Sequence, residues 1–355
     1  MADKFFLLNF ICMRKASFIF SRELFIFVEN YTTRSQEVFI LKKWQLLSSA
    51  ALLTVTLTAC NSEKATDEQT ANDMAEVTEK AQYPITLTDA LDKEITLEKA
   101  PQRIITLTPS NTEILFGLGL NDEIIAVNDN DTYPEEALTK ESVGGMEFNL
   151  EQIIGLQPDL VLAHESGMYS FNEQAIAQLE SVGIPVYVVK DAKTFEETYE
   201  TIEQIGQLTN KEQEAKEMIA SIKEGIEEIE VKVADLEEKS VFIVVGTDPD
   251  LYAAGEETFI SEMLDVLNVE NAVPELGWPM YSSEQFVNSN PDVILVTYES
   301  DMAAIEKNDA YAEMDAVKNG NVKLVDGDTT SRQGPRIVEG IESIGAAIYP
   351  EVFNE

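Results

Sequence analysis

Three observations predict an α/β protein of two Rossmann-like lobes, each with a parallel sheet, joined by a single long helix. A short pattern occurs twice, once in each half of the chain. Segments typical of strands alternate with segments typical of helices on both sides of residues 194–239. Within residues 194–239 no strand is expected, and apolar residues recur at helical spacing.

The repeated pattern reads NLEQIIGLQPDLVL at residues 149–162 and SSEQFVNSNPDVIL at residues 282–295. In each copy a polar residue suited to an N-cap precedes a first-turn glutamate, Glu151 or Glu284, which meets the positive end of the helix dipole. A proline then ends the helix, and the apolar run that follows is typical of a buried parallel strand. Two copies of this unit indicate two similar lobes. Stabilisation of a helix end is by itself a sufficient explanation for either glutamate.

The first lobe, residues 83–192, begins with the alternation typical of a hairpin at residues 83–99. Ser110 and Glu113 form the pattern of a capping box, for a helix that is expected to end at Gly119. Strands are expected at 104–107, 124–127, 160–162 and 186–189, with a further helix at 174–181.

Residues 193–239 are expected to form two helices, the first at 194–208. The second has apolar side chains at Met218, Ile222, Ile226, Ile229, Val233 and Leu236, all on one face. We interpret it as a helix that bridges the lobes, with an ordinary surface helix as the alternative. In the second lobe, residues 240–355, we expect strands at 241–245, 293–296 and 322–325, a loop at 246–255, a helix at 258–267 and a closing helix.

The N-terminal region indicates export. Two lysines precede an apolar run that is too short to span a bilayer, and the run ends in LTAC at Cys60. This pattern resembles the lipobox of bacterial lipoproteins, so residues 41–59 are expected to be a signal peptide and Cys60 to be acylated. Because LKKWQLLSSAALLTVTLTAC is a complete signal by itself, we hypothesise that residues 1–40 are a start-site misassignment. Residues 60–82 are polar, without an aromatic residue, and are expected to be a disordered tether.

Composition excludes several classes of function. The net charge is −40 and the pI about 4.2, which leaves no basic surface for general nucleic-acid binding. A single histidine, His164, cannot build a His-rich zinc or manganese site. No nucleophile elbow and no phosphate-binding loop is present. A surface enzyme acting through paired carboxylates stays open, since 65 acidic residues offer many pairs.

The order of further motifs resembles the substrate-binding lipoproteins of ABC importers, in the iron-siderophore and vitamin B12 (cobalamin) group, class III with a bridging helix. The motifs are PQRIITLTPSNTEILFGLG from Pro101, Tyr133-Pro134, VGG from Val143, NLEQIIGLQPDLVLA, LYAAGEETFISEML from Leu251, GWPMYSSEQF from Gly277, NPDVILV and SRQGPR from Ser331. The resemblance implies a ligand cleft between lobes that close only slightly, no catalytic residues, and neither a cofactor nor a resident metal.

The loops at the carboxyl ends of the strands would line that cleft. In the first lobe they carry Ser110, Asn111, Tyr133, Met146, His164 and Glu165, and in the second Tyr252, Trp278, Tyr281 and Arg332. Alternatives stay open for several of them. Ser110 is already explained as a cap. Trp278 is either an aromatic that stacks on a flat macrocycle or a loop anchor, and His164 is either a buried histidine or an axial metal ligand. Arg332 pairs with a ligand acid or with its own lobe, and Arg336 is interpreted as structural.

The ligand implied by the resemblance is a corrinoid or a ferric siderophore, delivered to an ABC permease. Haem and metal ions are the alternatives within the same superfamily. The WP-Y-S-x-E loop and the SRxGPR ending look closest to vitamin B12 binders. The resemblance also implies that Glu151 and Glu284 dock onto arginines of a two-fold permease dimer. It further implies a monomer, anchored to the outer face of the cell membrane through lipid on Cys60.

Overall fold

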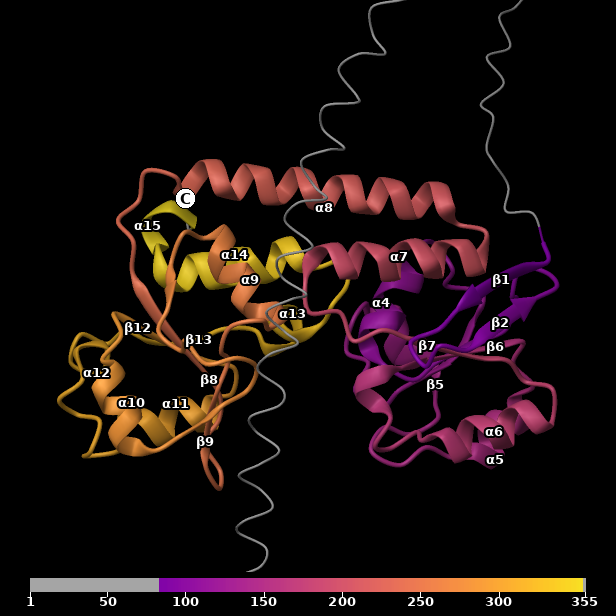
Figure 1. Cartoon of the computed structure of the whole chain (residues 1–355), viewed down its shortest axis with the longest axis horizontal. Helices are drawn as coiled ribbons and strands as arrows, with labels where there is room; N and C mark the ends of the chain where they lie inside the picture. Colours follow the sequence, from indigo (N-terminus) through magenta and orange to yellow (C-terminus); the bar gives the residue numbers. More distant parts are fainter. Residues whose placement is uncertain (1–82, 354–355) are drawn as a thin grey trace, which may run out of the picture. The chain divides into compact units, whose positions relative to one another are not determined.

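The computed structural model describes residues 83–353 (Figure 1). The predicted signal peptide, the tether and the acylation of Cys60 lie outside the described residues, as does the hypothesis on residues 1–40. Across the described part of the chain, no helix combines the length and apolar character that crossing a bilayer requires.

The first lobe contains the expected hairpin and one sheet. The hairpin pairs β1 (Ile85–Thr88) with β2 (Glu94–Leu97) in antiparallel fashion. The sheet is wholly parallel, as predicted, in the order β5-β4-β3-β6-β7. Its strands are β3 (Ile104–Thr106), β4 (Ile124–Val127), β5 (Glu141–Ser142), β6 (Leu160–His164) and β7 (Val186–Val189). Its helical segments are α4 (Pro109–Gly117), η1 (Glu135–Thr139), α5 (Leu150–Leu156), η2 (Glu165–Gly167) and α6 (Glu173–Ser181).

The capping box expected at Ser110 is wrong. Helix α4 starts at Pro109, and its N-cap is Thr108, which makes no side-chain cap bond. Proline is well suited to the first helical position because its fixed φ is helical and it has no N–H that needs a partner. Ser110 therefore lies inside the first turn, and the carboxylate of Glu113 is bound by two arginines instead.

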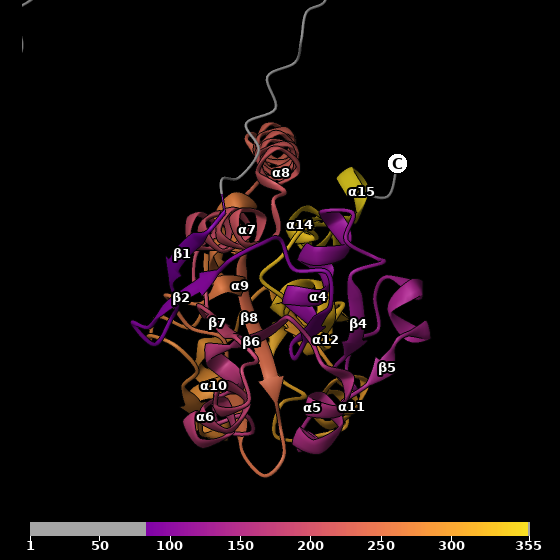
Figure 2. The same ribbon diagram turned by 90° about the vertical axis from the view of Figure 1, so that its right-hand side faces the viewer.

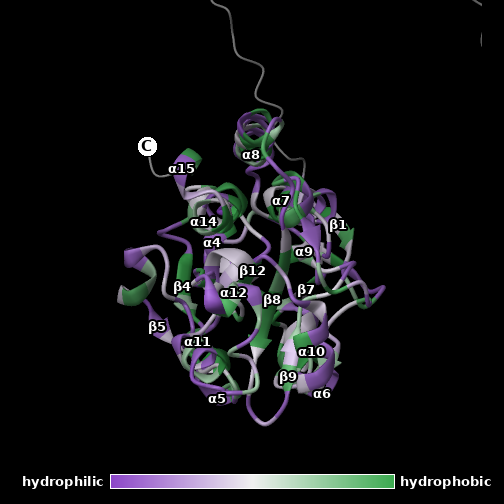
Figure 3. Ribbon diagram, turned by 90° about the vertical axis from the view of Figure 1, so that its left-hand side faces the viewer, coloured by the Kyte–Doolittle hydropathy of each residue, from purple (hydrophilic) through white to green (hydrophobic). Residues whose placement is uncertain are grey.

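Two helices follow, as predicted: α7 (Phe195–Thr209) and the 22-residue α8 (Glu212–Val233). Figure 1 shows α8 running along both lobes, and Figures 2 and 3 show it above α7 and α14 (Ile337–Ile348). Its buried residues are Ala215, Ile219, Ile222, Ile226, Ile229 and Val233. They belong to one hydrophobic core that includes strands of both sheets, so α8 is a bridging helix and not an isolated surface helix.

The sheet of the second lobe is mixed, which corrects the prediction of a parallel sheet there. The order is β11-β9-β8-β12-β13, with β10 beside β8. The pairs β8–β12 and β12–β13 are parallel, whereas β9 is antiparallel to β8 and to β11. The strands are β8 (Ser240–Gly246), β9 (Leu251–Ala253), β10 (Glu270–Asn271), β11 (Met280–Tyr281), β12 (Val293–Val296) and β13 (Val322–Leu324). The expected loop at residues 246–255 thus contains strand β9, which returns beside β8.

The second lobe also contains short helices between and after its strands. They are α9 (Phe259–Val266), α10 (Ser283–Ser289), α11 (Glu299–Glu306), α12 (Asp315–Lys318), α13 (Gly327–Ser331) and α15 (Pro350–Phe353), besides α14. Figure 3 colours β4 and β8 largely as hydrophobic, and most residues of these two strands are buried.

Both copies of the repeated pattern form the predicted helix and strand. Asn149 caps α5 by accepting from the N–H of Gln152, and Ser282 caps α10 through a capping box with Gln285. Each helix ends in a left-handed residue, Gln157 or Asn290, directly before the proline that leads into the core strand.

Candidate functional site

A hollow of about 130 Å³ lies at the carboxyl ends of β3, β4 and β6 in the first lobe. The strands end at Thr106, Val127 and His164, so the loops after them converge at one edge of the sheet. Ligands of open α/β sheets bind at this edge. The lining residues are Leu107, Thr108, Pro109, Asn128, Asn130, Gly145, Met146, Phe148, Ala163, His164, Ser166, Gly167, Tyr169, Ser170 and Phe171.

His164 is the last residue of β6 and is only 4% exposed. The backbone N–H of Ser166 donates to Nδ1 at 3.3 Å, and the hydroxyl of Ser166 lies 2.8 Å from the same nitrogen. Burial lowers the pKa of His164, which the nearby carboxylates of Asp191 and Glu165 oppose. The imidazole is therefore neutral near pH 7, with one edge fixed by Ser166.

Ser110 and Asn111 are both buried, and each has a side-chain oxygen without a hydrogen-bond partner. The amide of Asn111 donates to the backbone oxygen of Ala163 at 3.0 Å, which ties α4 to the end of β6. Glu165 is exposed and accepts from the backbone N–H of Asp191. These three residues frame the sheet edge around His164.

Arg332 belongs to a buried ion-pair cluster that joins the two lobes. Its guanidinium donates to Glu113 at 2.8 Å, and that of Arg336 makes two bonds to the same carboxylate at 2.6 and 2.8 Å. Glu113 is 2% exposed, and the side chains of both arginines are 10% exposed. We call Glu113, Arg332 and Arg336 the clasp. Arg332 is thus not free to bind a ligand acid, and it pairs with the opposite lobe and not with its own alone.

Further polar contacts surround the clasp. Arg332 also donates to the backbone oxygen of Asn130 and the hydroxyl of Thr132, and it pairs with Asp328 at 2.7 Å. Gln333 donates to Asp191 at 3.4 Å. The loops after β4 and β7 of the first lobe therefore meet the segment 328–336 of the second.

Asp131 lies beside the clasp and is almost fully buried. Burial raises the pKa of Asp131 to about 6, against the opposing effects of Thr112, Asn128 and Arg332. Its Oδ2 accepts from the N–H of Asn128 at 2.7 Å, whereas Oδ1 has no partner among the described residues.

Exposed aromatic and thioether side chains gather at the same sheet edges. In the first lobe Met146 is 70% and Tyr169 is 74% exposed, and the Tyr169 hydroxyl lies 3.8 Å from the Met146 sulfur. Tyr133 is also exposed, and the guanidinium of Arg336 stacks over its ring at 4.3 Å. Exposed apolar side chains that gather in one patch are typical of a binding surface.

The second lobe presents a matching set. Tyr252 pairs directly with Met280 across β9 and β11, so their exposed side chains lie side by side. Trp278 is 55% exposed in the loop just before β11, and Tyr298 is exposed after β12. Tyr281 differs, because its ring is buried against Phe242 and its hydroxyl donates to Glu275. The expectation that Tyr281 faces a ligand is therefore corrected: it belongs to the core.

Several residues of the site were not predicted from the sequence. Tyr169 and Tyr298 follow strand ends by a few residues, so the rule that selected His164 also points to them. Asn130 and Met280 lie within loops that were already selected. Glu113 was expected only as part of a capping box, and its ion pairs gave no signal because its partners are 219 and 223 residues away in the chain.

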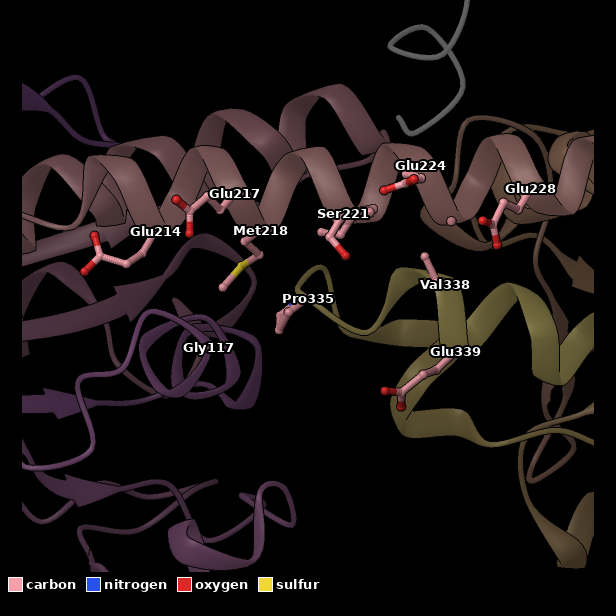
Figure 4. A pocket seen from close by; sticks show the side chains of 12 residues that line it. Gly117, Glu214, Glu217, Met218, Ser221, Glu224, Glu228, Pro335, Val338 and Glu339 are labelled. Atoms are coloured by element: carbon pink, nitrogen blue, oxygen red, sulfur yellow. The ribbon is translucent and has the colours of Figure 1, made fainter. Parts of the chain in front are cut away.

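Glu151 and Glu284 are exposed in the first turns of α5 and α10, one on each lobe. A separate hollow of about 650 Å³ lies beneath α8, lined by Met218, Pro335 and Val338 and by several glutamates (Figure 4). Among residues 83–353, no three His, Cys, Asp or Glu side chains are grouped so as to hold a metal ion.

Comparison with known proteins identifies the family. The model of the periplasmic binding protein family matches residues 104–329. An uncharacterised ABC transporter substrate-binding lipoprotein of Bacillus subtilis (strain 168), YvrC, is 42% identical over 316 residues, which cover 88% of this chain and 98% of that protein. A vitamin B12-binding protein of Pectobacterium atrosepticum is 30% identical over 252 residues, or 69% of this chain and 87% of that protein.

A solved structure agrees with these matches. It is that of a possible iron-binding, periplasmic solute-binding protein from Staphylococcus epidermidis, which is 39% identical with a TM-score of 0.66. The match covers 71% of this chain and 100% of that one. The chain therefore belongs to the periplasmic binding protein family and is a substrate-binding protein of the ABC transporter type.

Proposed function

We propose that this protein is an extracytoplasmic receptor that captures a corrinoid and delivers it to an ABC permease. The observation that carries the proposal is the pair of exposed aromatic and thioether rims at the strand ends of the two lobes. Met146 and Tyr169 form one rim, and Tyr252, Trp278 and Met280 form the other. A large, flat, largely apolar macrocycle would bury these side chains by stacking.

The clasp bears on the choice between a corrinoid and a ferric siderophore. A strongly anionic ferric complex is bound best by free arginines. Arg332 and Arg336 are largely buried and share the charge of Glu113, so they are not available for that purpose. A vitamin B12-binding protein among the relatives supports the same choice.

Haem is the second candidate, because one observation favours it. The ring of His164 is neutral and lines the hollow beside Met146, and a neutral imidazole is a common ligand of haem iron. A metal ion alone is disfavoured, since no cluster of ligands was found in the described residues. The carboxylate enzyme is disfavoured by the membership of a transport family.

A titration tests the ligand. The chain has two tryptophans, of which Trp44 precedes Cys60, so Trp278 is the single reporter in the processed protein. Cobalamin should quench its fluorescence and bind saturably in calorimetry, and Trp278→Ala should weaken binding at least tenfold by removing a stacking surface. The control is Val231→Ala, at an apolar side chain on α8 that is even more exposed than Trp278. Saturable binding of haemin or a ferric hydroxamate without binding of cobalamin would replace the corrinoid, and binding of none would refute the receptor.

We further propose that Glu151 and Glu284 dock onto the permease. Both are exposed, and they occupy equivalent positions in the two lobes, as contact with a two-fold dimer requires. The double change to alanine should leave ligand affinity intact and stop uptake. Glu173→Ala with Glu299→Ala is the matched control, since these glutamates also lie exposed in first turns, one on each lobe. Equal uptake by both double variants would reduce Glu151 and Glu284 to helix-end stabilisers.

Finally, we propose that the receptor works as a monomer held at the outer face of the cell membrane by lipid on Cys60. The lipoprotein relative in Bacillus subtilis supports this anchoring. Cys60→Ser should release the protein into the medium, and retention at the membrane would contradict the lipid anchor.

A further inference from the structure

The hollow at the ends of β3, β4 and β6 is free of carboxylates. None of its fifteen lining residues is Asp or Glu, although the chain has 65 of them and a net charge of −40. By contrast, the hollow beneath α8 is lined by Glu214, Glu217, Glu224, Glu228 and Glu339 (Figure 4). The first hollow therefore differs from the hollow beneath α8 in having no negative charge in its lining.

The N-terminus of α4 opens into this hollow. Thr108 and Pro109, its N-cap and first residue, are both lining residues. No side chain caps the helix, and no acidic residue occupies its first turn. The backbone N–H groups of Ser110 and Asn111 have no partner among the described hydrogen bonds, and both residues lie buried behind the lining residues. An uncapped helix start of this kind attracts negative charge through its N–H groups and its dipole.

His164 supplies a second, independent donor. The two contacts of Nδ1 with Ser166 fit either tautomer of the neutral ring, and in the tautomer in which Nδ1 accepts from the N–H of Ser166 the proton is on Nε2. Nε2 has no hydrogen-bond partner in the described chain, and the atom is not fully enclosed by protein. His164, which is 4% exposed and lines the hollow, offers an N–H to it in this tautomer, the one that a bound anion selects.

Asn130 adds a third donor. Its neighbour Asn128 is engaged at both side-chain atoms, since its amide nitrogen donates to the backbone oxygen of Leu107 and its oxygen accepts from the N–H of Asn130. The side-chain amide of Asn130 makes no hydrogen bond within residues 83–353, and it lines the hollow. The backbone oxygen of the same residue accepts from Arg332, which fixes the loop to the clasp.

We propose that this hollow is a subsite for an anionic group of the ligand, a carboxylate or a phosphate, which His164 Nε2 and Asn130 bind beside the positive end of the α4 dipole. A volume of about 130 Å³ suits one such group and not a macrocycle, because sites for whole small molecules measure roughly 300–1,000 Å³. The inference rests on the proposed function and deepens it. The macrocycle lies against the exposed rims, while an acidic substituent reaches into the hollow.

The single histidine of the chain makes the test direct. His164 gives the only imidazole signals in the NMR spectrum of the full chain. Sodium phosphate and sodium acetate should each be titrated at constant ionic strength against sodium chloride. We expect a saturable shift with phosphate or acetate and a raised pKa of His164, since a bound anion stabilises the imidazolium beyond the effect of Asp191 and Glu165. The anion that saturates at lower concentration identifies the group.

Asn130→Asp is the decisive variant, because it is isosteric, places a carboxylate in the hollow and keeps the histidine probe. It should weaken phosphate or acetate binding at least tenfold. Asn121→Asp, at an exposed position after α4, is the matched control and should bind as the unchanged protein does. Shifts that match those of chloride, or saturable binding that survives Asn130→Asp, would overturn the subsite.

These outcomes are separable from those of the proposed function. Failure of cobalamin, haemin and a ferric hydroxamate to bind the unchanged protein would refute the receptor, while the anion titration still decides the hollow. If the macrocycle binds and the anions do not, the receptor stands and the subsite is wrong.

Discussion

At the scale of single residues, Asp131 makes stability depend on pH. Burial raises the pKa of Asp131 from 3.8 to about 6. Between these values the folded state holds a proton that the unfolded state has lost, so the free energy of unfolding falls as the pH rises through this window. Asp131→Asn cannot ionise. As the pH rises from 4 to 8, the free energy of unfolding of this variant should therefore increase by about 2–3 kcal/mol relative to that of the unchanged protein, since one pKa unit corresponds to about 1.4 kcal/mol.

Urea unfolding at several pH values measures this difference. Asp122→Asn, at an exposed position, is the control, and it should change the free energy of unfolding equally at both ends of the pH range. A constant difference between Asp131→Asn and the unchanged protein across the range would contradict the raised pKa.

Individual residues show why the site could be predicted only in part from the sequence. His164 and Tyr252 could be placed because strand ends are visible in the sequence, and ligands bind at strand ends. The role of Arg332 could not, because its main partner, Glu113, lies in the other lobe. Tyr281 looked like its exposed neighbour Met280, but side chains alternate along a strand, and only the fold decides which face is buried.

At the scale of elements, the close packing of α8 against α14 depends on one glycine, Gly225. A Cβ at Gly225 would lie 2.7 Å from Cγ2 of Val338 on α14, and a β-branched side chain has little freedom to move away. Gly225→Ala gains about 1 kcal/mol of helix propensity, yet overpacking of a core contact costs about 1–3 kcal/mol. We expect a net loss of stability, measured by urea unfolding.

Two further variants isolate the cause. Gly225→Ala with Val338→Ala should recover the loss, because the second change removes the obstructing methyl groups. Gly117→Ala should cost less than Gly225→Ala, since its Cβ would meet the flexible end of Met218 at 2.5 Å. If Gly225→Ala were more stable than the unchanged protein, α8 would not be closely packed at this point.

Elements were the best-predicted level of this structure. Apolar spacing predicted α8, and the repeated pattern predicted both α5–β6 and α10–β12, since each signal is local in the sequence. Two errors came from competing local signals. Pro109 took the first helical position and displaced the expected cap, and the turn-rich residues 246–255 concealed the strand β9.

At the scale of the whole molecule, the clasp and the shared core hold the two lobes together. The core around α7, α8, α9 and α14 is continuous, whereas the clasp ties the loops that border the site.

Glu113→Gln would leave two largely buried guanidinium groups without a counter-charge, and breaking a buried ion pair in this way costs roughly 3–5 kcal/mol. We expect that loss in urea unfolding. We also expect faster hydrogen exchange at residues 128–133 and 328–336, with strands β3 and β8 changed only in proportion to the global loss. Glu136→Gln, at an exposed position in η1, is the control and should change neither measurement. A loss below about 1 kcal/mol with unchanged exchange in both loops would show that the core alone joins the lobes. With the predicted result, the clasp restrains the lobes at the ligand site, because α8 and the core fix only their far side.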